Sequence, residues 1–251
     1  MKLGAQLYSL RSFLKEPEEL KKTFFRIRDI GYENVQLSGA APMPADFLHA
    51  VSEESGLPIV CTHSPLERIL NDTDALIREH RQFGCPVIGL GAMPSEVRGD
   101  REGMERVIDE LEAPVARILD AGLHFAYHNH AFEFVSADGT TLYDEMLERL
   151  PHWQFILDTY WVEFAGFSAT EYIRKVGGDR LVNIHFKDMA ADEKRSICAC
   201  GDGVLDFRKI FDVCREIGVR NVLVEQDNAV EAPDPFAEMR RSFGYLRGIV
   251  S

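Results

Sequence analysis

The feature that most constrains the fold of this chain is a repeated alternation between short, β-forming apolar runs and longer segments of helical periodicity. Five of the runs follow a glycine that can end the preceding helix, and they read GYENVQL, GLPIVCTH, GCPVIGLG, GLHFAYHNH and GVRNVLVE. Three more, LGAQLYS at the start, WQFILD near 155 and RLVNIHFKD near 183, bring the expected strands to eight. This alternation predicts parallel strands joined by crossover helices.

The helical segments between the runs also have recognisable beginnings. Asp206 and Asp234 are suitable N-terminal caps for the last two helices. The expected helix starts lie near Glu18, Ala45, Asp72, Glu102, Thr141, Thr170, Phe207 and Pro235. Each expected strand is therefore followed by one helix.

Eight strand-helix units in 251 residues predict an α/β fold of the (β/α)8 TIM-barrel type. No Ser/Gly/Pro-rich linker divides the sequence, so we expect a single domain over residues 1–251. The alternative is a doubly wound sheet. That fold would show fewer strands and a glycine-rich phosphate loop after the first one, whereas this first strand runs into YSLRS and the chain has no G-x-G-x-x-G.

Charge and composition exclude several classes of partner. A formal net charge of -13 disfavours nucleic acid and anionic lipid, and no apolar run is long enough to span a bilayer. The N-terminal MKLGAQLYSLRS lacks the features of a signal peptide, so a cytoplasmic location is expected. Five cysteines without a C-x-x-C pair suggest neither disulfides nor structural zinc, and the oligomeric state, including a homo-oligomer, stays open.

Polar residues gather where the expected strands end. Four of the eight histidines are found there, together with several carboxylates, whereas the opposite strand ends carry Gly, Leu, Pro and Arg. The active sites of TIM barrels lie at these C-terminal strand ends. The candidates are Tyr8, Gln36, His63, His128, His130, Glu133, Asp158, His185, Lys187 and Glu225.

Strand periodicity groups some of these side chains. Residues two apart share a face, so His128 points with His130, and His185 points with Lys187. Asp158 and Glu225 end otherwise apolar strands, where a carboxylate is costly to bury unless a cation or several donors meet it. A helix cap would also explain either carboxylate alone. Taken together, these oxygen and imidazole donors suit Mn²⁺, Mg²⁺, Co²⁺ or Zn²⁺.

Five stretches resemble the xylose-isomerase-like TIM barrels, a group of sugar isomerases, epimerases and inosose dehydratases. They are YHNHAFEF, ILDTYW, NIHFKD, GDGVLDF and LVEQD, in the order and spacing of that family over essentially the whole chain. The YHNH-x-x-EF stretch is similar to a subgroup of sugar phosphate isomerases and epimerases. The resemblance implies one divalent ion held by Glu, Asp, His and Glu from strands five to eight.

The resemblance places Asp158, His185 and Glu225 at three ligand positions. The fourth is open, because relatives usually carry that glutamate inside the fifth strand, where this chain has FAYHNH. We expect Glu133 to be the ligand, in preference to His128 or His130, and the histidines then to contact substrate or fix the carboxylate.

A second departure is Trp161, which stands where many relatives have a histidine. It would serve as a platform for a sugar ring or pack in the core. The DNA-repair branch of the superfamily needs that histidine, so its absence and the acidic charge argue against DNA repair.

The expected activity is that of a metal-dependent sugar isomerase or epimerase, which moves a proton beside a carbonyl through an enediolate. Glu225 is the expected base and Glu133 its partner. Lys187 would stabilise the enediolate oxygen or pair with a carboxylate, and His63 would reach a substrate hydroxyl or only cap the next loop. Tyr8 and Gln36 are further pocket candidates. The alternatives are a dehydratase or lyase using the same site, and a sugar-binding barrel without catalysis.

Overall fold

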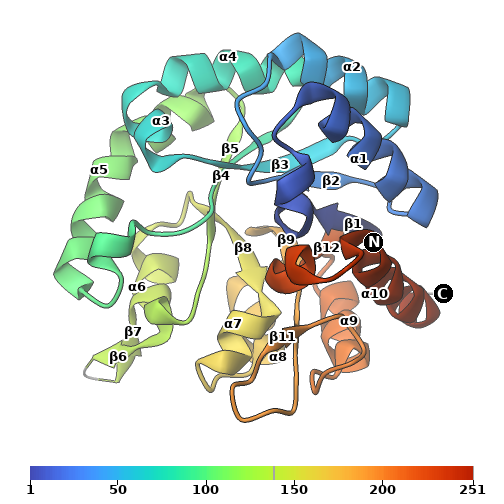
Figure 1. Cartoon of the computed structure of the whole chain (residues 1–251). Coiled ribbons are helices and arrows are strands. Elements are labelled where there is room, and N and C mark those ends of the chain that lie inside the picture. Colours follow the sequence, from blue (N-terminus) through green and yellow to red (C-terminus); the bar gives the residue numbers. More distant parts are fainter. Residues whose placement is uncertain (138, 251) are drawn as a thin grey trace.

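The computed structural model describes residues 1–137 and 139–250, in which eight parallel strands form a closed barrel inside a ring of helices (Figure 1). The last barrel strand pairs with both its predecessor and the first strand, which closes the sheet. The predicted TIM barrel is therefore confirmed. Its strands are β1 (Lys2–Gln6), β2 (Val35–Leu37), β3 (Ile59–Ser64), β4 (Val87–Leu90), β5 (His124–His128), β8 (Gln154–Asp158), β9 (Leu181–Phe186) and β12 (Asn221–Val224).

The helices that cover the barrel begin at, or within one residue of, the starts predicted from sequence. Asp206 and Asp234 both act as caps, accepting hydrogen bonds from the backbone N–H groups of Lys209 and Phe236. None of the described helices is both long and apolar enough to cross a bilayer. The helices are α1 (Pro17–Ile30), α2 (Ala45–Ser55), α4 (Thr73–Phe83), α5 (Arg101–Asp120), α6 (Leu142–Arg149), α8 (Ala169–Val176), α9 (Phe207–Glu216) and α10 (Pro235–Val250).

Additional short elements lie between the C-terminal end of a strand and the next covering helix, where they build the mouth of the barrel. The periodicity did not predict them, because each is too short to show a repeat. They are the helices α3 (Leu66–Asn71) and α7 (Thr159–Phe164), the 3₁₀ turns η1 (Leu7–Phe13), η2 (Ser95–Val97), η3 (Phe132–Phe134) and η4 (Asp227–Glu231), and the hairpins of β6 (Ser136–Ala137) with β7 (Thr140–Thr141) and of β10 (Asp188–Met189) with β11 (Ile197–Cys198).

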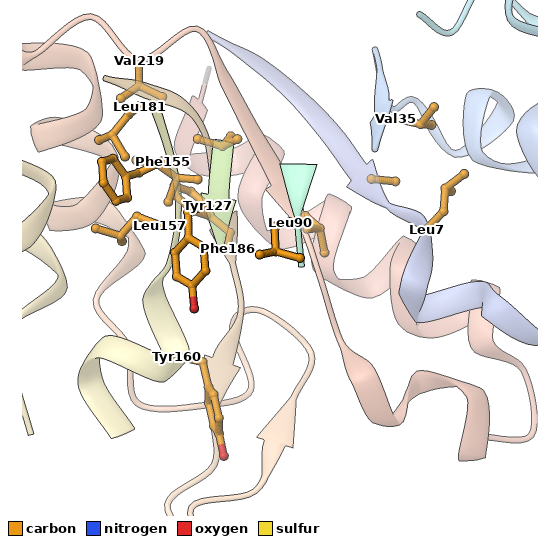
Figure 2. Packing of buried hydrophobic residues seen from close by; sticks show 14 of the residues in the cluster. Leu7, Val35, Leu90, Tyr127, Phe155, Leu157, Tyr160, Leu181, Phe186 and Val219 are labelled. Carbon is orange, nitrogen blue, oxygen red and sulfur yellow. The ribbon is translucent and has the colours of Figure 1, made fainter. Parts of the chain in front are cut away.

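The apolar core has two parts. The larger part packs barrel strands against helices, and Figure 2 shows Phe155, Leu157 and Leu181 within it. Burying an aliphatic or phenylalanine side chain of this kind stabilises the fold by about 1.5–3 kcal/mol. The smaller part includes Cys61, Ala126 and Ile156, each two residues before a polar residue in the last two positions of its strand. Because residues two apart share a strand face, this small cluster forms the floor beneath His63, His128 and Asp158.

Candidate active site

Four buried side chains converge at the C-terminal end of the barrel. His128 ends β5, Asp158 ends β8, His185 lies in β9, and Glu225 follows β12. Each offers one ligand atom, and these atoms all lie within 4.8 Å of one another. The four strands are neighbours in the barrel, so the cluster occupies one side of its mouth.

Hydrogen bonds fix how both histidine rings face this cluster. Nδ1 of His128 lies 2.9 Å from the carbonyl oxygen of Gly91, which can only accept, so Nδ1 donates and Nε2 keeps its lone pair. Nε2 of His185 lies 2.8 Å from Oε1 of Gln36, which leaves the lone pair of that ring on Nδ1. Such partners behind the ring are the usual way of orienting a metal-binding histidine.

The free lone pairs point at carboxylate oxygens. Nε2 of His128 lies 3.4 Å from Oδ2 of Asp158, and Nδ1 of His185 lies 2.9 Å from Oε2 of Glu225. Acceptors that face each other repel unless a proton or a cation lies between them. Two imidazole nitrogens and two carboxylate oxygens form a donor set that fits a divalent ion. The cluster therefore has the composition and convergence of a divalent-metal site.

Lys187 adds a positive charge beside these acceptors. Its ammonium nitrogen is buried and lies 3.4 Å from Asp158, 3.3 Å from Glu225 and 2.9 Å from Asp227. Burial alone would lower the pKa of Lys187, but these carboxylates outweigh it and raise the pKa, so the side chain stays charged. One ammonium among three carboxylates leaves two of them without a formal counter-charge, which is the charge that a divalent ion supplies.

The carboxylates of the cluster are ionised. Burial acts to raise the pKa of Asp158, but Lys187 and the neighbouring histidines hold it well below its usual range. The pKa of Glu225 is lowered in the same way, by Lys187 and His185 against the effect of burial. Conversely, the pKa of His185 is raised because Glu225 and Asp158 outweigh its burial.

Glu133, our expected fourth ligand, does not join the cluster. Its carboxylate accepts hydrogen bonds from the hydroxyl of Tyr127 and, at 2.8 Å, from the backbone N–H of His130. Burial raises the pKa of Glu133 to about 7 despite these bonds. The η3 turn directs this side chain back beneath the loop, so the structure brings His128 rather than Glu133 beside Asp158.

A cavity of about 440 Å³ opens above the cluster. Of the predicted substrate-binding residues, His63, His128, His130 and Tyr8 line it, together with Lys187 and Glu225. Gln36 is buried behind His185 instead. The ring centre of Trp161 lies 5.1 Å from the ring centre of His130 and 5.4 Å from the ammonium nitrogen of Lys187. These two residues support the cavity from behind.

A match to a protein-family model shows which family the chain belongs to. Residues 24–248 match the model of a family described as the xylose isomerase-like TIM barrels. The chain belongs to this family. No curated protein matches the chain.

Among solved structures, the xylose isomerase-like barrel resembles sugar isomerases or epimerases and a dehydratase. A sugar phosphate isomerase/epimerase from Parabacteroides distasonis is 23% identical, with a TM-score of 0.78 and coverage of 98% of both chains. An L-ribulose 3-epimerase is 15% identical, with a TM-score of 0.74, coverage of 99% of this chain and 94% of the other. A probable 3-DHS dehydratase from Bacillus anthracis is 12% identical, with a TM-score of 0.73 and coverage of 98% of this chain and 99% of the other. At these identities the likeness shows the fold.

Two cavity residues of this xylose isomerase-like barrel had no role in the sequence prediction. Asp227 lines the cavity and contacts Lys187, and its position two residues after Glu225 could have indicated a shared direction. Arg98 also lines the cavity, but it follows η2 in an exposed loop where no strand register points to it.

Asp188 organises the loop beside the site and stays out of the cluster. Its carboxylate accepts hydrogen bonds from the backbone N–H groups of Met189, Gly201, Gly203 and Leu205, at 2.8–3.1 Å. A Cβ on Gly203 would lie 2.3 Å from Oδ1 of Asp188, so this position requires glycine. Asp188 therefore folds the GDG turn, whose two glycine amides are already bonded.

Proposed function

We propose that this xylose isomerase-like barrel is a divalent-metal-dependent isomerase or epimerase that acts on a ketose or keto-sugar by proton transfer through an enediolate. The observation that carries the proposal is the convergence of four acceptor atoms, two on histidines of fixed tautomer, beside the buried Lys187 ammonium.

In the proposal His128, Asp158, His185 and Glu225 hold the ion, with His128 taking the place that we expected for Glu133. When bound, a divalent ion polarises a sugar carbonyl and stabilises negative charge on its oxygen. Gln36 and the Gly91 carbonyl keep the two imidazoles in the required tautomers.

Glu225 is the proposed base. It lines the cavity, and its lowered pKa keeps it ionised near neutral pH. Oε2 faces His185 and Lys187, and Oε1 takes part in neither contact, so it can accept a proton from the carbon next to the carbonyl. General base catalysis of this kind contributes about 10²–10⁴-fold.

Two further residues of the cavity complete the proton transfer. The Lys187 ammonium stabilises the developing oxyanion, because a buried charge already held in place needs no reorganisation. Glu133, expected as the partner acid, does not line the cavity, whereas Asp227 does. We therefore assign to Asp227, in its protonated form, the acid of an epimerisation: it gives a proton to the opposite face, while Glu225 releases the proton that it took to water. In an isomerisation Glu225 itself carries the proton to the other carbon.

His63 and His130 are proposed to bind sugar hydroxyls. Burial and neighbouring charged or histidine side chains hold the pKa of each ring well below its usual range, so both are neutral near pH 7. A neutral imidazole can donate to or accept from a sugar hydroxyl. At His63 the nitrogen for this role is Nε2, because Nδ1 already faces the Gln6 amide.

A dehydratase or lyase is the second candidate. The same base would form the same enolate, which would then expel a leaving group from the next carbon. The structural neighbour described as a probable 3-DHS dehydratase favours keeping this candidate, because it has the same overall fold.

Metal analysis of the purified protein, followed by a deuterium-exchange assay on a panel of ketoses and keto-sugars, tests the proposal. We expect about one divalent ion per chain and metal-dependent exchange of a proton next to the carbonyl. Glu225→Gln should reduce exchange by at least about 100-fold. Glu216→Gln, which alters only an exposed ion pair with Arg174, is the matched control.

Each outcome of that assay has a defined meaning. Exchange without release of a leaving group supports the isomerase or epimerase, and release of water or an alcohol supports the lyase. Sugar binding without exchange, with or without metal, would contradict both and identify a binding protein.

A further inference from the structure

A second cavity, of about 550 Å³, lies beside the first. Both are lined by the residues that end β2 and β3 and begin the following loops, namely Ser38, Gly39, His63, Ser64 and Pro65. The first cavity lies over the barrel, on the side where His63 approaches His128 and His185. The second lies toward α2 and α4, on the side where Thr62 contacts His80. The two cavities are therefore neighbours, and these residues at the ends of β2 and β3 form the shared wall between them.

The second cavity differs from the first in its chemistry. It contains no counterpart of the carboxylate cluster among the described residues. Its charged residues are Arg68 and Glu79, which neutralise each other through two hydrogen bonds of 2.9 Å. The remaining lining is mostly apolar and comes from Leu37, Ala40, Ala41, Pro42, Met43, Leu48, Leu76 and Phe83. Such a surface accepts an uncharged apolar group and offers a phosphate no unpaired cation.

The shared wall also has fixed polar groups. His80 donates from Nδ1 to the Leu76 carbonyl at 2.8 Å, so its Nε2 accepts from the Thr62 hydroxyl at 2.9 Å. The Thr62 oxygen must then accept from Ser64, 3.0 Å away. This chain of bonds commits the hydroxyl hydrogen of Ser64 and leaves its oxygen as an acceptor at the boundary of the two cavities.

His63 supplies the matching donor. Gln6 accepts the Tyr8 N–H through Oε1, so its amide nitrogen faces Nδ1 of His63, at 3.4 Å. Nδ1 is then the acceptor of that ring, and Nε2 carries the hydrogen. Nε2 is buried and has no hydrogen-bond partner among the described residues. The two cavities therefore share one residue with an unused donor, His63, and one whose oxygen can still accept, Ser64.

We propose that the substrate is a keto-sugar carrying an uncharged, apolar substituent of about the size of an aromatic ring, joined through an oxygen atom. This proposal rests on the proposed function and specifies its substrate class. The sugar occupies the first cavity, the substituent the second, and the linking oxygen accepts a hydrogen bond from His63 at the shared wall. Volumes of 440 and 550 Å³ give each part a pocket of ordinary ligand-binding size.

The test compares two probes, the methyl and the phenyl β-glycosides of 3-keto-D-glucose, by calorimetric titration of the Mn²⁺-loaded protein. We expect the phenyl compound to bind about 10-fold more tightly, because its ring leaves water for an apolar cavity. Ala41→Phe, which fills the second cavity, should abolish this preference. Ala50→Phe is the matched control, because Ala50 is exposed on α2 and lines neither cavity.

A spectroscopic measurement avoids reliance on a folded Ala41 variant. Met43 lines the second cavity alone, so its ¹³C-labelled methyl resonance should shift with the phenyl probe and stay in place with the methyl probe. Equal affinities, a preference that survives in Ala41→Phe, or an unmoved Met43 signal would overturn this proposal. If the probes exchange deuterium in those cases, the proposed function stands. If neither probe binds but the metal-loaded protein exchanges deuterium into another keto-sugar of the panel, this inference fails and the proposed function stands. If no sugar of the panel exchanges, both fail.

Discussion

The two halves of the barrel mouth differ in charge. The strands β5, β8, β9 and β12 end in the buried cluster of His128, Asp158, His185 and Glu225, with Lys187 among them. The strands β1 to β4 end in neutral groups, such as Ser38, His63 and Gly91. The halves are nevertheless joined, because Gln36 and the Gly91 carbonyl orient the two histidines of the cluster. The charged half thus contains the candidate metal ligands, and the neutral half orients the two histidines among them.

The largest expected effect comes from removing one charge from the charged half. Asp158→Asn keeps an oxygen that can cap the Trp161 N–H but loses the anion next to Lys187 and the histidines. Affinity for a divalent ion should fall by more than about 100-fold, the upper end of the cost of losing a supporting residue. Competition with a fluorescent chelator measures it. Unchanged affinity would mean that the charged half holds no ion at Asp158.

Glu133 is a buried carboxylate in the same half that makes no ion pair among the described residues. Its pKa is therefore raised, whereas the pKa of Asp158 is lowered. The pKa of Glu133 is about 7 in the folded protein, against its usual value of 4.5. Below pH 4.5 Glu133 is protonated in both states. Between 4.5 and 7 the unfolded chain releases this proton while the folded chain keeps it, so the free energy of unfolding falls, and above 7 the loss is complete.

Glu133→Gln removes this dependence. The stability of the variant relative to the wild type should therefore rise by about 3 kcal/mol between pH 4.5 and 7, with most of the change complete at neutral pH. Urea unfolding of the metal-free proteins across this range measures the difference, with the exposed Glu216→Gln as control. Parallel stability curves for Glu133→Gln and the wild type would show that Glu133 is ionised throughout.

The dependence of one half on the other is tested at Gln36. Gln36→Leu leaves Nε2 of His185 without its acceptor, so the ring no longer prefers the tautomer with a free Nδ1. Metal affinity should fall about 10–100-fold. Gln6→Leu is the matched control, since Gln6 ends the adjacent strand and contacts His63 instead. Equal losses of metal affinity in Gln36→Leu and Gln6→Leu would show that the neutral half affects the metal site only through packing.

The smallest effect, on KM, is expected at His63 in the shared wall between the two cavities. His63→Asn removes the ring that lines both cavities and leaves the cluster intact. KM should rise about 10-fold with metal affinity unchanged, because one hydrogen bond to an uncharged group is worth about 0.5–1.5 kcal/mol. Steady-state kinetics with a metal titration separates the two. A loss of metal binding would place His63 with the charged half.

The sequence predicted those parts of the molecule that depend on local periodicity. Glycine-ended helices and apolar runs indicated every barrel strand and each covering helix. In a barrel, the strand ends meet at one mouth, so Asp158, His185 and Glu225 could be placed together before any coordinates were known. The structure brings all three into one cluster.

The parts that the sequence did not predict depend on short turns and distant contacts. The position of Glu133 did not follow from strand periodicity, because η3 turns its side chain back to the His130 N–H. This arrangement resembles a helix cap, which the three-residue spacing could have suggested. The pairing of His185 with Gln36 joins residues 149 positions apart, and no local pattern reports such a contact. The second cavity likewise arises from how α2 and α4 pack beside the loops.

Closure of the barrel by β12 has a consequence for how the protein is made. This strand pairs with β1, the first strand of the barrel, and Glu225 follows it directly. A ribosome-bound chain that has reached His185 already carries three members of the cluster but lacks both the closing strand and the last carboxylate. Because non-local strand pairing is slow relative to helix formation, those three lack the fourth until β12 has been made and pairs with β1. The complete set of donor atoms therefore comes together only when the first and last strands of the barrel pair.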